Sequence, residues 1–265
     1  MRIIISPAKK MNREEDSLEC LGMPFFLKDA EKIMQWMQTL SLTEAKTLWG
    51  CNDTLAEMNF RRFQEMDLYK RLTPAILSYE GIQYQYMAPA VFETGMLTYI
   101  QEHLRILSGF YGVLKPMDGV TPYRLEMQAK AKAGGKRDLY EFWGERIYQQ
   151  IIEDDDRVII NLASKEYSKC VESYLLPQDT FITCTFGEVS GEKIVQKGTY
   201  AKMVRGEMVR YMAEKNITDP QQMKNFDRLG YHFQEEWSTE DNFVFIKEGK
   251  NGDRDTQEQP ENNGA

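Results

Sequence analysis

The residue types best suited to ligand binding gather in one constrained stretch, residues 105–127. Three glycines there permit backbone conformations that other residues avoid, and two prolines fix the chain around a turn. A constrained loop with cations and aromatic rings suits a nucleic acid or nucleotide, whose phosphates attract charge and whose bases offer flat faces. A tight strand–turn–strand corner with solvated arginines explains the same composition, so both interpretations stay open. The candidate ligand-binding side chains of this stretch are Arg105, Tyr111, Lys115, Tyr123 and Arg124.

Further polar side chains follow predicted strands. Residues 3–5 form an apolar run that predicts a buried strand, and Ser6 and Lys9 come soon after it. Residues 158–162 predict a second buried strand, which contains Asn161 and leads to a helix that opens at Ser164 and Lys165. Strand exits and helix N-termini are common ligand-binding positions in α/β folds. A capped turn or helix with solvated lysines remains the simpler interpretation at both places.

Two further pairs of cations are notable for their positions. Thr199 is predicted to cap a helix that runs to about residue 216. Lys202 and Arg205 lie three residues apart in its opening turns, where positive charge opposes the helix dipole. A bound phosphate or a structural acid could compensate them. Lys136 and Arg137 end a basic, glycine-containing segment from residue 130, which we predict to be a hinge or flap because the spacing of a phosphate-binding Walker loop is absent.

Glu126 raises an enzymatic alternative. It lies two residues beyond Arg124 and therefore shares a strand face with it, as either a general base or the salt-bridge partner of that arginine. No complete catalytic triad accompanies it. The alternative is an enzyme that acts on a nucleobase, a nucleotide or damaged nucleic acid. Its proton-transfer, oxyanion and phosphate groups would come from Ser6, Lys9, Tyr123, Arg124, Glu126, Asn161 and Ser164.

The sequence contains no motif for a metal site or for a cofactor. The four cysteines are widely scattered, only two histidines are present, and the acids have no compact ligand spacing. The predicted strand–helix junctions lack the glycine-rich fingerprint of dinucleotide folds. We therefore predict reduced, packed cysteines, no metal site and no cofactor, and direct iron sequestration is the least supported function.

Net charge argues against a nucleic-acid partner and its distribution argues for one. The chain carries a formal charge of −8, whereas phosphate-binding domains are usually basic. Residues 105–146 nevertheless hold eight Lys and Arg against five Asp and Glu, and residues 193–210 hold five against one. An acidic shell around a basic groove would reconcile these numbers.

The remaining patterns supply the elements that must position these side chains. The 265 residues, 42% hydrophobic and 28% charged, are typical of a soluble globular protein, and apolar runs of only a few residues predict no membrane span and no signal peptide. Ser41 and Glu44 predict a capping box for a helix that stops at Gly50, and Asp53 is expected to cap the next helix. Alternating strands and helices predict one compact α/β domain with a mixed sheet and surrounding helices over residues 1–247. Residues 248–265 are expected to be a disordered acidic tail, and we expect a cytoplasmic monomer.

The chain also resembles a known family. The matching segments keep their order to about residue 247, which makes the resemblance far more specific than any one motif. They are residues 4–9 (Ile-Ile-Ser-Pro-Ala-Lys), 105–127, 138–144 (Asp-Leu-Tyr-Glu-Phe-Trp-Gly), 158–167, 200–206 (Tyr-Ala-Lys-Met-Val-Arg-Gly) and 230–233 (Gly-Tyr-His-Phe). Together they resemble the YaaA family of bacterial peroxide-stress proteins.

This resemblance implies a cytoplasmic protein that limits oxidative damage by keeping intracellular free iron low. It also implies binding of double-stranded DNA through a positively charged cleft and a helix–hairpin–helix element, on an unusual α/β architecture. The sequence meets this expectation only in part: Gly109 and Gly112 enclose two residues, but Pro116 and Pro122 favour extended chain afterwards rather than an immediate second helix. On this hypothesis Tyr111 and Tyr123 are available for stacking, and the phosphate contacts are Lys9, Arg105, Lys115, Arg124, Lys136, Arg137, Lys165, Lys202 and Arg205.

Overall fold

A mixed β-sheet runs through the middle of the molecule. The computed structural model describes residues 1–14, 18–153 and 157–247, and the predicted acidic tail lies outside them. In spatial order the strands are β11 (Tyr231–Phe233), β12 (Asn242–Lys247), β9 (Thr180–Ser190), β8 (Val158–Leu162), β1 (Arg2–Ile5), β5 (Leu104–Ser108) and β6 (Gly112–Leu114), with β10 (Lys193–Val195) paired to β9. This sheet and the helices around it form one compact domain, as predicted from the sequence.

The centre of the sheet is parallel and its edges are antiparallel. β1 pairs in parallel with both β5 and β8, and β8, β9 and β12 continue in the same direction. β6 and β11 run antiparallel to their neighbours. Ile3, Ile4 and Ile5 point alternately to opposite faces and are all fully buried, so both faces of the central strands are covered. This is why the apolar runs at residues 3–5 and 158–162 predict strands correctly.

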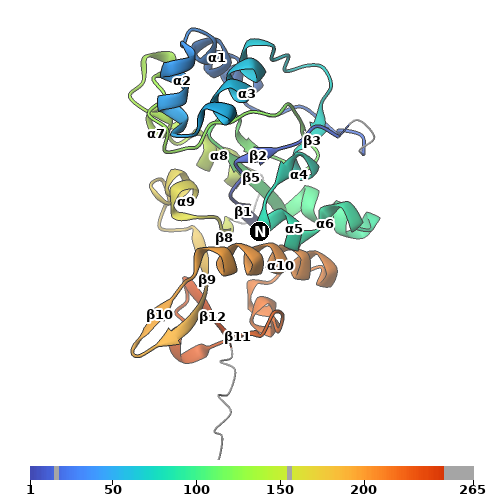
Figure 1. The fold of residues 1–265 in the computed structure, drawn as a ribbon. Coiled ribbons are helices and arrows are strands. Elements are labelled where there is room, and N and C mark those ends of the chain that lie inside the picture. The colour runs from blue at the N-terminus through green and yellow to red at the C-terminus, as the bar shows by residue number, and fades with distance from the viewer. Residues whose placement is uncertain (15–17, 154–156, 248–265) are drawn as a thin grey trace, which may run out of the picture.

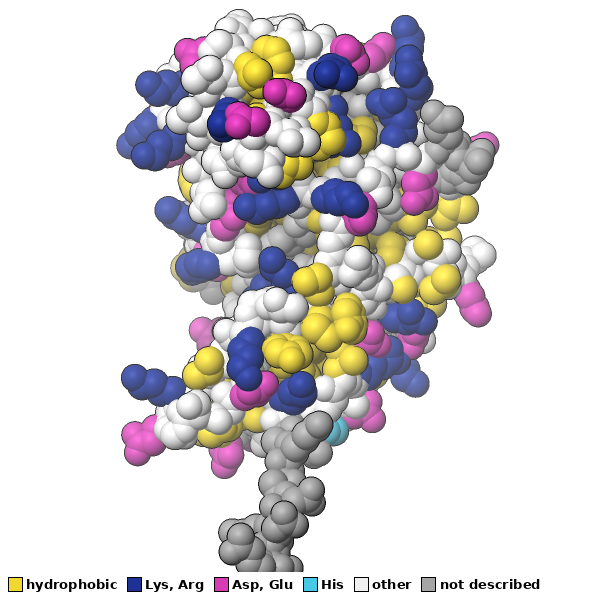
Figure 2. Space-filling view, in the orientation of Figure 1, with side chains coloured by type: hydrophobic (Ala, Val, Ile, Leu, Met, Phe, Trp, Pro, Cys, Tyr) yellow, Lys and Arg dark blue, Asp and Glu magenta, His cyan; other side chains and the backbone are white. Residues whose placement is uncertain are grey.

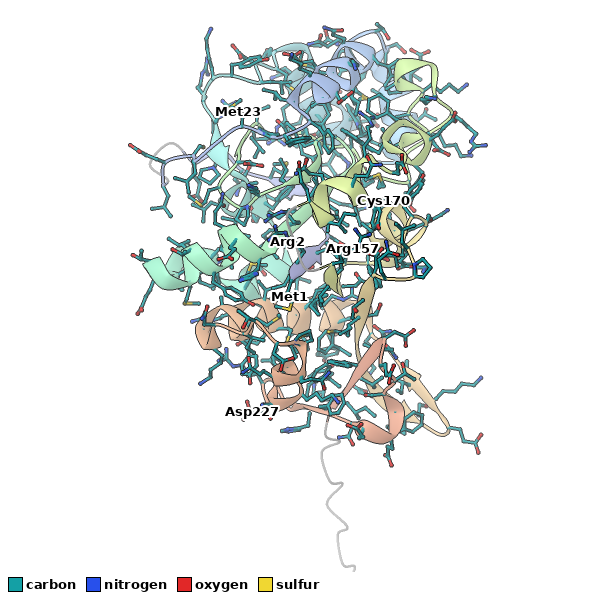
Figure 3. All side chains as sticks on the ribbon, turned by 180° about the vertical axis from the view of Figure 1, so that it is seen from behind. Met1, Arg2, Met23, Arg157, Cys170 and Asp227 are labelled. Carbon is teal, nitrogen blue, oxygen red and sulfur yellow. The ribbon has the colours of Figure 1, made fainter. Side chains whose placement is uncertain are left out.

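Helices surround the sheet, some at one end of the molecule and others across its middle (Figure 1). They are α1 (Leu27–Gln38), α2 (Leu42–Trp49), α3 (Asp53–Gln64), α4 (Ala75–Ser78), α5 (Ile82–Met87), α6 (Thr94–His103), α7 (Leu139–Trp143), α8 (Arg146–Ile152), α9 (Lys165–Glu172) and α10 (Gly198–Lys215). Figure 1 shows α1, α2 and α3 at one end, β9–β12 at the other, and α10 across the middle. Seen from behind, Met1 and Arg2 lie between these two ends (Figure 3), so β1 occupies the centre of the molecule.

The predicted helix caps are confirmed in part. Ser41 and Glu44 form the capping box, and Gly50 ends α2 in the left-handed conformation with φ +56°. Asn52, rather than Asp53, caps α3, because its side chain accepts the Leu55 N–H at 3.0 Å. The prediction for Thr199 was wrong, since α10 already begins at Gly198 and has no side-chain cap.

The glycine- and proline-rich stretch folds mainly as strands and extended chain. β5 turns back into β6, and the chain then continues through β7 (Gly119–Val120), which pairs with β3 (Thr73–Pro74). A second small sheet joins β2 (Lys10–Met11) to β4 (Tyr79–Glu80). A Cβ on Gly109 would lie 2.6 Å from the Leu125 carbonyl oxygen, so only glycine fits where the hairpin meets residues 125–127. Extended chain therefore follows α6, and the helix–hairpin–helix element stays a prediction.

Two negative findings hold for the described part of the chain. No helix there is both long enough and apolar enough to cross a bilayer. Within the same residues, no three or more His, Cys, Asp or Glu side chains come together in a way that could hold a metal ion.

Candidate functional site

Two neighbouring parallel strands send the chain in opposite directions at their carboxyl ends. The chain leaves β1 and returns as β5 on one side of it, whereas it leaves β8 through α9 and returns as β9 on the other side. The gap between β1 and β8 is therefore the topological switch point of the sheet, where open α/β sheets bind ligands. Ser6 follows β1 and Ser164 follows β8 at this point.

Hydrogen bonds hold the two strand exits together. The Ser164 backbone N–H donates to Ser6 Oγ at 2.8 Å, and Ser6 Oγ donates to Ser164 Oγ at 3.1 Å. Tyr84 OH, from α5, donates to the Ser6 carbonyl at 3.0 Å. Ser164 occupies the N-cap position of α9, yet its side chain makes no capping bond to that helix. Its hydroxyl instead accepts the hydrogen bond from Ser6, which links the ends of β1 and β8.

A cavity of about 400 Å³ opens over this junction. In Figure 2, Lys and Arg side chains border the hollow in the middle of the face, above α10. The cavity is lined mostly by polar side chains from the β1 exit, α5, the extended chain at 123–126, α9 and α10. These are Ser6, Lys9, Gln83, Tyr84, Tyr123, Arg124, Glu126, Ser164, Glu166, Tyr167, Lys202 and Arg205, and Lys10 and Glu80 line it as well.

Glu126 forms the charged centre of one wall. Its Oε1 lies 3.2 Å from Arg124 Nη2 and 3.2 Å from Lys9 Nζ. The side chains of Arg124 and Glu126 are only 12% and 11% exposed, whereas that of Lys9 is largely in solvent. Glu126 is thus the salt-bridge partner of Arg124, one of the two roles predicted for it. Arg124 Nε is buried and has no hydrogen-bond partner in the described structure.

The opposite wall comes from the first half of α10. Gly206 lets this helix approach α5 closely, because a Cβ there would lie 2.0 Å from the Gln83 carbonyl oxygen. Arg205 is thereby held against the cavity, where burial lowers the pKa of its guanidinium. Arg205 Nε is buried without an acceptor, and neither Arg205 nor Lys202 meets a carboxylate among the described residues.

Gln83 adds another unused donor. Its side chain is 7% exposed, and its Nε2 has no hydrogen-bond partner within the described residues. Gln83, Arg124 and Arg205 therefore line one cavity with buried N–H groups that nothing in the described chain satisfies. Buried donors without partners carry a free-energy penalty, which an acceptor-rich ligand or ordered water would remove.

The same cavity also contains two titratable side chains whose pKa is raised by burial. Burial, reinforced by the charge of Glu126, raises the pKa of Glu166, which accepts the Gln128 N–H at 3.2 Å. Tyr123 OH lies 2.6 Å from Ser108 Oγ and 2.8 Å from Tyr79 OH, and burial raises its pKa to about 12. A carboxyl of raised pKa beside an ion-paired one is an arrangement found in acid–base sites.

The structure brings together some of the predicted site residues and separates others. Lys9, Arg124, Lys202 and Arg205 share the cavity with Ser6, Tyr123, Glu126 and Ser164. Asn161 lies buried beneath it and accepts the Ala163 N–H at 3.0 Å. Tyr111 is buried and accepts the Thr121 N–H at 3.2 Å, which leaves it no face for stacking.

The other predicted cations lie elsewhere. Arg105 and Lys115 line a separate cavity of about 250 Å³, and the buried Arg105 donates to the Leu104 carbonyl at 2.7 Å. Lys165 pairs with Glu172. Lys136 and Arg137 pair with Glu141 and Asp138 at 3.8 and 3.5 Å, beside α7.

Sequence reasoning missed several residues of the cavity. Gln83 and Tyr84 lie on the six-residue α5, which has no capping motif to draw attention to it. Gly206 and Glu166 fall inside segments that resemble the known family but attracted no separate interpretation. A glycine in the middle of a helix was the one available signal, because such a residue often marks close packing.

Fold and cavity together define an α/β protein with a polar cavity at the switch point of its sheet. Comparison of the sequence with known proteins identifies the family. The chain belongs to the family described as peroxide stress protein YaaA, whose model matches residues 1–237.

Relatives match it over almost their whole length. A UPF0246 protein of Agathobacter rectalis is 56% identical over 245 residues, which cover 92% of this chain and 98% of the relative. A UPF0246 protein of Lachnoclostridium phytofermentans is also 56% identical, over 96% of this chain and 99% of the relative. One from Pediococcus pentosaceus is 51% identical over 247 residues.

Proposed function

We propose that this cavity and its rim bind double-stranded DNA, and that this binding protects the cell during peroxide stress. The observation that carries the proposal is the set of unsatisfied donors, with Arg205 Nε and the Gln83 amide buried and Lys202 exposed at one opening. Phosphate oxygens are strong acceptors, and arginine binds them in a bidentate manner. The formal net charge of −8 is compatible with this proposal if the binding charge is local.

The size of the cavity limits how DNA could bind. A volume of about 400 Å³ falls in the range of small-ligand sites. We therefore propose that the duplex lies across the rim, with Lys9 and Lys202 on its backbone, and that one phosphate or nucleotide reaches the half-buried Arg124 and Arg205. Binding through the backbone would be weakly sequence-specific and strongly salt-dependent.

Charge reversal tests this proposal. Lys202→Glu with Arg205→Glu should weaken binding of a labelled duplex by at least about tenfold, because charge-assisted hydrogen bonds are replaced by repulsion. The matched control is Lys193→Glu with Lys215→Glu, two exposed lysines in β10 and at the end of α10. Equal weakening in both double variants, or affinity that does not change with salt, would contradict a localised backbone contact.

The iron-linked part of the function and the cellular setting are proposals from the family resemblance. We propose a cytoplasmic monomer that helps to limit damage linked to intracellular free iron. In a strain that lacks this protein, the wild-type chain should restore peroxide resistance and the doubly reversed variant should not, at equal protein level. Equal rescue by both would separate stress resistance from the cavity.

A second candidate function rests on two carboxyl groups of the cavity, Glu126 and Glu166. One carboxylate is ion-paired and the other has a raised pKa, so the cavity offers a base and an acid to a bound nucleobase or nucleotide. Incubation with nucleotides and damaged duplexes, with product analysis for wild type, Glu126→Gln and Glu166→Gln, tests this alternative. Turnover that both substitutions abolish would support an enzyme, and turnover that neither changes would exclude these two residues as the acid–base pair.

A further inference from the structure

A larger groove adjoins the cavity. It encloses about 960 Å³ and shares Lys9 and Glu126 with the cavity, so the two spaces are neighbours across one wall. One side of the groove comes from α1 and α2, at the helical end of the molecule in Figure 1. The other side is the chain at residues 126–132, directly after the glycine- and proline-rich stretch.

That chain presents positive charge at regular intervals. Residues 128, 130 and 132 are exposed and line the groove, whereas the three alanines at 129, 131 and 133 are buried. The alternation of exposed and buried residues places Lys130 and Lys132 on the same side of this segment, facing the groove. Neither lysine has a carboxylate partner among the described residues. The two groove acids are already engaged, Glu44 with Ser41 and Glu126 with Arg124 and Lys9.

Two tryptophans provide the aromatic part of the groove. Trp36 of α1 is half-buried and lines it. Trp49 also lines it and is 4% exposed, and its indole Nε1–H is buried without an acceptor in the described chain. A groove with unpaired lysines on one side and tryptophans on the other has the two components of a single-strand binding surface, which are backbone charge and a base-stacking platform.

We propose that this groove binds a single DNA strand that continues from the cavity, with a base stacked on Trp36 and phosphates at Lys130 and Lys132. This inference rests on the proposed function, because the cavity must hold DNA for a strand to continue from it. It specifies the preferred substrate, which is DNA with an unpaired segment next to a duplex. The unpaired Trp49 N–H supplies a donor to that strand from the floor of the groove.

The test compares three kinds of DNA probe that share one duplex sequence: a blunt duplex, that duplex with a single-stranded tail (of each polarity in turn), and the single strand. Wild type should bind a tailed duplex about tenfold more tightly than the blunt one, because each stacked base adds appreciable affinity. Lys130→Gln with Lys132→Gln, and separately Trp36→Ala, should remove this preference and leave blunt-duplex affinity within about twofold. The matched control for charge is Lys193→Gln with Lys215→Gln, which should retain the preference.

Each result has a defined meaning. Both lysines are exposed, so their double variant should fold, and Trp36→Phe should keep part of the preference because it retains an aromatic face. Equal binding of blunt and tailed duplexes by wild type, with no change in the groove variants, would overturn this inference and leave the proposed function intact. Failure of wild type to bind any of the three probes would overturn both.

Discussion

The two halves of α10 treat arginine differently. In the second half, Arg210 Nε lies 2.8 Å from Glu214 Oε1, and Arg228, from the following segment, reaches Glu207 at 2.8 Å and also Glu214. Arg228 further covers the ring of Tyr211 at 5.0 Å. In the first half, Arg205 faces a cavity and meets no acid among the described residues.

The two halves of α10 therefore differ in whether the arginines near them are paired with carboxylates of the protein. The cluster around Arg228 is complete within the protein, because Glu207 and Glu214 both form charge-assisted hydrogen bonds with this arginine. Arg205 is half-buried and has a lowered pKa, which is unfavourable for the folded chain alone. Binding sites commonly carry such local disadvantages, since the ligand supplies the missing partner.

The largest effect is expected at Gly206, where the two halves meet. Gly206→Ala places a methyl group against the Gln83 carbonyl and should reduce the free energy of unfolding by about 1–3 kcal/mol, because α10 must move away from α5. DNA binding should fall with it, since Arg205 and Gln83 both shift. Chemical denaturation and duplex titration measure the two effects.

Gly198→Ala is the matched control for this substitution. A Cβ there meets nothing within 4 Å, so stability should hold or increase slightly with the better helix propensity of alanine. Equal losses at Gly198 and Gly206 would show that helix propensity, and not the contact with α5, governs the effect.

Arg228→Met should lower the stability of the protein without changing its affinity for DNA. It leaves Glu207 and Glu214 without their shared partner and should cost about 1–2 kcal/mol, because hydrogen bonds to charged groups are lost at partly exposed sites. Duplex affinity should change by less than about twofold in this variant. A clear loss of affinity would remove the distinction between the two halves.

Arg205→Gln should give the reverse result. Duplex affinity should fall about tenfold, in line with one lost charge-assisted contact, while the melting temperature stays the same or rises. Arg210→Gln removes the same charge from the same helix and should leave binding nearly unchanged. If the two variants weaken binding alike, then only net charge matters and the cavity has no special part.

The smallest effect concerns pH. Since burial raises the pKa of Glu166, its neutral form appears as the pH falls from neutrality towards the carboxyl range, and DNA binding should strengthen a few-fold. The folded protein then binds this proton more tightly than the unfolded chain, so the contribution of Glu166 to stability falls as the pH rises through that range. Glu166→Gln should flatten the dependence of duplex affinity on pH.

Glu214 provides the opposite case on α10. Its hydrogen bond to Arg228 is the first cause that lowers its pKa, so its stabilising contribution is present above the ordinary carboxyl range and is lost as the pH falls. Glu214→Gln should therefore leave the pH dependence of binding unchanged. A pH profile of binding that shifts with Glu214 would contradict the assignment to Glu166.

The sequence predicted the strands and helices better than it predicted which of their side chains share the cavity. Buried parallel strands are continuous β-branched runs, which is why residues 3–5 and 158–162 were recognised, and Ser41 with Glu44 made the second helix clear. Lys165 and Arg205 looked alike in the sequence, each in the opening turns of a helix. Lys165 pairs with Glu172 at the other end of its own helix, whereas Arg205 faces the cavity because α10 packs against α5, and only the structure shows that packing.

The bond between Ser6 and Ser164 joins positions 158 residues apart, and the cavity is complete only with Arg205 from α10. During synthesis, therefore, the site cannot form until α10 has been made. If the chain is cut between β1 and α10, the site remains only while the two fragments stay associated. A ligand held there would act as a clasp across the whole domain, so protection from proteolysis in the presence of DNA should extend to segments far from the cavity.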